Sequence, residues 1–165
     1  EDYAMWLEIA AHSQLANLPE ILLDYRAHAA QVGQRQRATQ QASSALVRLA
    51  QLRALGIDPA PAEQATHEAI STAQIAPTRA FIVAADSWLR RLLAANRASG
   101  RLHEPSLLPV LGLRWYTVCR LSTVLGPWVW WRFQRSPLAR HAPIDASRRA
   151  KFLLKALASS PTAIA

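Results

Sequence analysis

The chain has 165 residues, of which 51% are hydrophobic and 18% are charged. This length and composition suffice for a domain with a hydrophobic core and exclude a wholly disordered chain. The one cysteine, Cys119, excludes an internal disulfide and a zinc site built on several cysteines. Five scattered glycines form neither of the glycine-rich loops that cradle nucleotide phosphates. We therefore expect no complete nucleotide site of those two types.

The positive charge is concentrated in the second part of the chain. Residues 69–165 hold fourteen lysines and arginines against three acids, whereas residues 1–68 hold five arginines against eight acids. The arginines are spread among apolar segments without a recognisable binding motif, so nucleic acid is not an expected partner. The chain begins with Glu1, and a helical pattern starts at once. We therefore expect it to be a piece of a longer protein.

The first part of the chain predicts a helix followed by two strands. Residues 3–12 place apolar side chains at helical intervals, and Asp2 stands where an N-cap residue would accept a hydrogen bond from the first free N–H groups. Residues 14–18 and 21–26 then flank a Pro-Glu pair, and the second segment alternates its side chains with the period of a strand. We predict a short amphipathic helix and a small pair of β-strands.

Helical periodicity dominates the rest of the chain. Between residues 107 and 133 the apolar content rises, but the longest uncharged run has eleven residues. A membrane-spanning helix needs about 20, so no span is expected there. Proline and glycine mark helix starts and stops. We predict helices over residues 34–55, from Pro61 toward Ser71, from Pro77 to Gly100 and over residues 145–158.

Three motifs follow one another within the first 28 residues: EDYAMWL at 1–7, ANLPEILL at 16–23 and YRAH at 25–28. In this order they resemble the downstream part of a family 2 glycosyltransferase. The resemblance implies the C-terminal part of a GT-A α/β glycosyltransferase, mainly α with a small pair of β-strands near its N-terminus. Residues 1–33 would end the catalytic domain, and residues 34–165 would form a helical C-terminal region.

The resemblance implies inverting transfer of a sugar from a nucleotide-sugar donor to an acceptor hydroxyl on a glycan or a lipid-linked acceptor, in cell-surface glycan synthesis. The family's second acid removes the proton from that hydroxyl, and this role maps onto Asp2, with Glu1 beside it. Arg26 and His28 stand at the YRxH positions and are expected to contact the diphosphate leaving group. His28 is also a candidate ligand of a divalent metal, Mn or Mg, in the intact enzyme. Trp6 is expected to shape the acceptor side.

The chain departs from the family's pattern in two places. No DxD metal motif occurs in its 165 residues, and residues 29–33 differ from the family's usual continuation. By itself the fragment is expected to bind no metal and to be inactive. Each candidate also has a structural interpretation: Asp2 as a helix cap, Trp6 as a core residue, and Arg26 with His28 as an exposed pair at a strand end.

A second feature is a stretch in which tryptophans and arginines alternate. Aromatic rings and guanidinium groups together suit the headgroup layer of a membrane. The alternative is that the tryptophans pack inside the protein. We expect a cytoplasmic protein, and membrane contact would place it peripherally on the cytoplasmic face of the membrane. The competing function is a non-catalytic basic helical module that binds a membrane surface or a partner protein. The candidate membrane residues are Trp115, Trp128, Trp130, Trp131, Arg114, Arg120 and Arg132.

Overall fold

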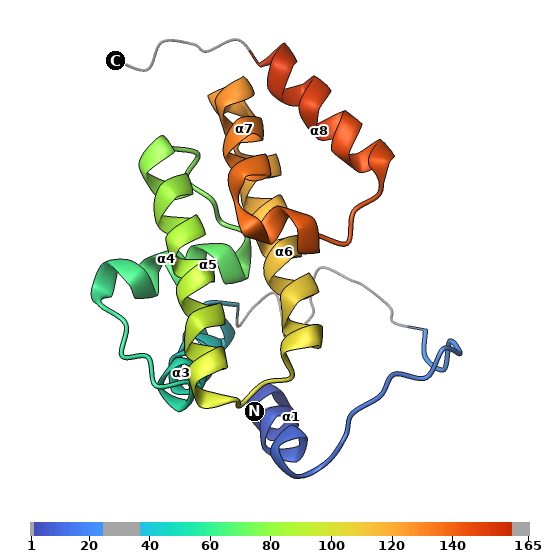
Figure 1. The fold of residues 1–165 in the computed structure, drawn as a ribbon. Helices are drawn as coiled ribbons and strands as arrows, with labels where there is room; N and C mark the ends of the chain where they lie inside the picture. Colours follow the sequence, from blue (N-terminus) through green and yellow to red (C-terminus); the bar gives the residue numbers. More distant parts are fainter. Residues whose placement is uncertain (1, 25–36, 160–165) are drawn as a thin grey trace. The chain divides into compact units, whose positions relative to one another are not determined.

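The computed structural model describes residues 2–24 and 37–159 (Figure 1). The chain divides into two compact units, Glu1–Gln51 and Leu52–Ala165. The described part of the first unit contains α1 (Asp2–His12) and most of α3 (Arg37–Ala54). The second unit contains α4 (Pro61–Thr72), α5 (Arg79–Ser99), α6 (Glu104–Leu121), the 3-10 turn η1 (Thr123–Leu125), α7 (Pro127–Arg135), the 3-10 turn η2 (Pro137–His141) and α8 (Ala146–Ala158). The boundary predicted between residues 33 and 34 lies outside the described residues.

The prediction of a pair of β-strands is wrong, and with it the GT-A α/β fold class. Within residues 2–24 and 37–159 no residue lies in a strand, and residues 14–18 and 21–24 belong to no helix either. A strand persists only when its N–H and C=O groups pair with a neighbouring strand, and the described chain provides none. The alternating side chains are accordingly uncovered, with Ile21 90% and Leu23 78% exposed. Residues 25 and 26 of the second predicted strand lie outside the described residues.

The predicted helices are confirmed where the structure describes them, and their ends follow local chemistry. The Thr78 hydroxyl accepts a hydrogen bond from the N–H of Phe81 at 3.1 Å, which caps α5. Gly100 ends the same helix in the left-handed region, at φ +62°. Asp145 caps α8 by accepting from the N–H of Arg148 at 2.7 Å. No described helix combines the length and the apolar content that crossing a bilayer requires.

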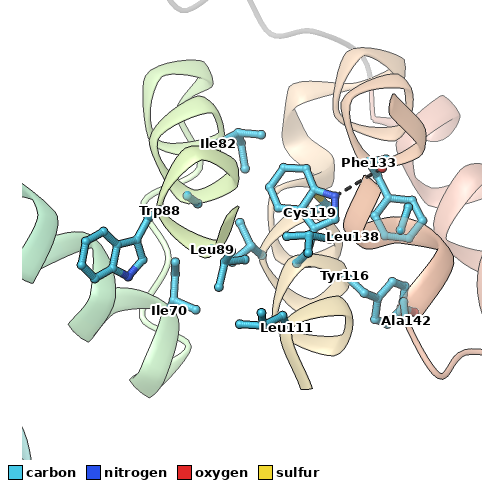
Figure 2. Packing of buried hydrophobic residues seen from close by; sticks show 14 of the residues in the cluster. Ile70, Ile82, Trp88, Leu89, Leu111, Tyr116, Cys119, Phe133, Leu138 and Ala142 are labelled. Atoms are coloured by element: carbon cyan, nitrogen blue, oxygen red, sulfur yellow. Dashed lines mark hydrogen bonds between the residues drawn. The ribbon is translucent and has the colours of Figure 1, made fainter. Parts of the chain in front are cut away.

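The core of the second unit lies between α5 and α6, which run side by side in Figure 1. Ile82 and Leu89 of α5 and Trp115 of α6 are at most 2% exposed. The Trp115 indole N–H donates to the carbonyl of Phe133 at 3.2 Å, the dashed line in Figure 2. The ring is therefore buried without leaving its polar atom unpaired.

A cluster of aromatic rings joins α6, α7 and α8. Tyr116, Trp130, Phe133 and Phe152 contact one another with ring centroids 5.2–6.0 Å apart, most of them edge to face. Such pairs contribute about 0.5–1.5 kcal/mol each beyond the area that they bury. This cluster fixes α8 against the remainder of its unit.

The turn between α5 and α6 depends on one buried amide. Asn96 is 1% exposed; its Nδ2 donates to the carbonyl of Leu102 at 2.9 Å, and its Oδ1 accepts from the N–H of Leu102 at 2.7 Å. Asn96→Leu keeps the branched side-chain shape but removes both bonds, so we expect a loss of about 1–3 kcal/mol of unfolding free energy, measured by urea denaturation. Ser87→Ala, at an exposed position, is the control on the same helix, and an unchanged midpoint for Asn96→Leu would refute the assignment.

Candidate functional site

Asp2 is the first residue of α1, and its side chain is exposed. Trp6 follows four residues later, so the two side chains lie on the same side of the helix. The Trp6 side chain is 52% exposed and is not a core residue among the described parts of its unit. The start of α1 therefore presents a carboxylate and an indole ring together on an open surface.

The carboxylate of Asp2 borders a shallow polar pocket of about 550 Å³ within the first unit. Hydroxyl and amide side chains from α3 form most of its wall. Such groups both donate and accept hydrogen bonds, which suits a ligand rich in hydroxyl groups. The lining residues are Asp2, Tyr3, Thr39, Gln40, Ser43, Ser44 and Val47.

The other predicted residues of this site, Glu1, Arg26 and His28, lie outside the described residues. Within residues 2–24 and 37–159 no three His, Cys, Asp or Glu side chains come close enough to hold a metal ion. The described residues around Asp2 thus do not fit a divalent metal by themselves.

The tryptophans of the predicted membrane stretch do not share one surface. Trp115 is fully buried, and Trp130 belongs to the aromatic cluster. Trp128 is partly buried, with the Arg79 guanidinium 5.2 Å from its ring centre. Trp131 is 44% exposed and is covered in part by Arg135, whose guanidinium lies 4.3 Å from the ring centre. Helical periodicity in α6 and α7 turns these rings toward different surroundings.

The three predicted arginines likewise lie in different environments. Arg114 and Arg120 are exposed, whereas Arg132 is half-buried and pairs with Asp86 at 3.6 Å. Asp86 is 6% exposed; it also accepts a hydrogen bond from the Ser136 hydroxyl at 2.6 Å and faces Arg90 at 3.7 Å. A buried carboxylate needs such partners. Arg132 therefore neutralises a buried charge.

Cys119 lies beside this buried group and is 0% exposed. Burial, and next the negative charge of Asp86, raise the pKa of its thiol well above the ordinary value, and Arg132 offsets this only in part. Because the thiolate is the reactive form, we expect no reaction of the folded protein with a thiol reagent at about pH 8, and full reaction after denaturation. Rapid labelling of the native protein would contradict this burial.

A basic groove lies between α6 and α8, with a volume of about 480 Å³. Four cations line it, and the aromatic rings of Tyr116 and Phe152 contribute to its wall. The sequence shows Arg148, Lys151 and Lys155 at helical spacing, but only the packing of α8 near the last turn of α6 adds Arg120 to them. The complete lining is Leu113, Tyr116, Thr117, Arg120, Arg148, Lys151, Phe152 and Lys155.

Comparison with protein-family models, curated proteins and solved structures found no match to this chain. No family is therefore shown. The functional interpretation depends on the sequence motifs and on the geometry of the described residues.

Proposed function

We propose that this chain is the C-terminal portion of an inverting family 2 glycosyltransferase, with Asp2 as its general base. The observation that carries the proposal is the exposed Asp2 carboxylate at the start of α1, bordering a pocket lined by hydroxyl and amide groups. The EDYAMWL, ANLPEILL and YRAH motifs support it in their order along the chain. An acid that served only to begin a helix would not require that pocket.

The proposed reaction is a single displacement. Asp2 accepts the proton of an acceptor hydroxyl as the hydroxyl oxygen attacks the anomeric carbon of the donor sugar. The bond from that carbon to the diphosphate oxygen breaks, and the nucleoside diphosphate leaves with the electron pair. One displacement from the opposite side inverts the anomeric configuration. Trp6, on the same side of α1, would limit where the acceptor can lie.

Arg26 and His28 are proposed to stabilise the negative charge that develops on the departing diphosphate. They stand at the matching positions of the YRAH motif, outside the described residues. A nucleotide-sugar donor places the proposed reaction in the cytoplasm, and a glycan or lipid-linked molecule is the proposed acceptor.

The segment after α1 carries exposed apolar side chains that another part of a longer protein could cover. Leu18, Ile21, Leu22 and Leu23 are between 69% and 90% exposed. Burying a side chain of this kind contributes about 1.5–3 kcal/mol, so a covering surface would be strongly favoured. We propose that the rest of the enzyme supplies that surface.

The test is a donor panel with the intact protein. Uridine, guanosine and thymidine diphosphate sugars are each incubated with an acceptor extract, and release of the nucleoside diphosphate is measured. The proposal expects acceptor-dependent release from one nucleotide class. Absence of release from every donor, with protein that shows a cooperative unfolding transition, would overturn it.

A further inference from the structure

The basic groove between α6 and α8 is a concentrated positive site in the more basic unit. Residues 52–165 contain fifteen lysines and arginines against six acids. Arg120, Lys151 and Lys155 form no ion pair with any residue that the structure describes. Arg148 has one acidic neighbour, Asp145, at 3.9 Å on the rim. The groove therefore carries a local positive charge without an internal counterion for three of its cations.

Exposed leucines accompany these cations. Leu113 lines the groove and is 41% exposed. On α8, Leu154 is 65% exposed and Leu157 is 57% exposed. Leu154 lies three residues after Lys151, and residues at that spacing are neighbours on a helix surface. Leu113 on α6 therefore places apolar surface in the groove, and Leu154 on α8 places it beside Lys151, whereas Leu157 lies toward the other side of α8.

From this combination we propose that the basic groove docks onto a bilayer surface that carries anionic phospholipids. Lipid phosphates would pair with Arg120, Lys151 and Lys155, and Leu113 and Leu154 would enter the boundary between headgroups and acyl chains. Charge complementarity selects an anionic surface, and the leucines select a bilayer over a soluble polyanion. The proposal does not depend on the role of Asp2.

A vesicle sedimentation assay with the intact protein tests the role of the groove cations. We expect binding to phosphatidylcholine vesicles that contain about 30% phosphatidylglycerol, and little binding to pure phosphatidylcholine. The triple variant Arg120→Gln, Lys151→Gln, Lys155→Gln should lower partitioning by about 100-fold, because each cation near the surface contributes about fivefold. Arg101→Gln, Arg135→Gln, Arg140→Gln is the matched control with the same loss of net charge outside the groove, and we expect a much smaller effect from it.

Substitution of the exposed leucines distinguishes binding to a bilayer from binding to a soluble polyanion. Leu113→Ser with Leu154→Ser should weaken vesicle binding without changing its salt dependence between about 0.05 and about 0.5 M. Both variants change exposed side chains, and circular dichroism checks that the helices persist. Three results would overturn the proposal: no binding to anionic vesicles, equal losses for the two triple variants, or binding to soluble RNA or heparin that matches vesicle binding and ignores the leucine changes.

Discussion

Asp2→Asn is expected to lower the turnover number of the intact enzyme by about 10²–10⁴-fold, the usual contribution of a general base. The amide cannot accept the proton of the acceptor hydroxyl, whereas it keeps the size of the side chain. Asparagine and aspartate have nearly the same helix propensity, so α1 should persist. Because Asp2 is proposed to contact the acceptor hydroxyl and not the donor, the KM for the donor should stay within about twofold. Steady-state kinetics with saturating acceptor measure both parameters.

The matched control for Asp2 lies on the same helix. Glu8 is exposed and pairs only with His12, at 3.6 Å, among the described residues, so Glu8→Gln removes a carboxylate of α1 away from the proposed site. Its turnover should stay close to that of the unchanged protein. Equal turnover for Asp2→Asn and the unchanged protein would eliminate Asp2 as the base and leave it as a helix-starting residue.

Gly112→Ala is expected to destabilise the second unit by up to about 2 kcal/mol, although alanine favours helices. A Cβ atom at this position would lie 2.5 Å from the backbone nitrogen of Ala142 and 2.5 Å from the carbonyl carbon of His141. The gain in helix propensity is about 1 kcal/mol, whereas overpacking costs about 1–3 kcal/mol and more where the neighbour cannot move. Both neighbours are backbone atoms, so the cost should exceed the gain. Urea denaturation measures the difference.

Gly100→Ala provides the comparison for Gly112→Ala. A Cβ at Gly100 meets no atom within 4 Å, but its φ of +62° strains alanine by about 1–2 kcal/mol. The two variants separate a backbone-conformation cost from a packing cost. An increase in stability for Gly112→Ala would mean that the residues after η2 do not approach α6 closely.

The helices were predictable because their signals are local. Pro61 starts α4 and Gly100 stops α5, and the apolar side chains between such residues repeat with the helical period. The strand prediction failed because side chains that alternate with a period of two indicate a strand only where a neighbouring strand pairs with the segment's backbone. Ile21 and Leu23 have the pattern, yet no described strand pairs with them.

The candidate sites could likewise be predicted only where their residues lie close together in the sequence. Asp2 and Trp6 are four residues apart, so helical geometry alone predicts that they share one side of α1. Arg120 and Lys151 belong to different helices, and their common groove depends on how Tyr116 packs against Phe152. Composition also could not show that Trp115 is fully buried whereas Trp131 is 44% exposed.

The anomeric configuration of the first product tests the central proposal most directly. The intact protein, its preferred nucleotide sugar and an acceptor are followed by proton NMR from the earliest turnover. A single displacement assisted by one carboxylate predicts inversion, so an α-linked donor should yield a β-linked product. Retention of the donor's configuration, or hydrolysis without transfer, would contradict the account.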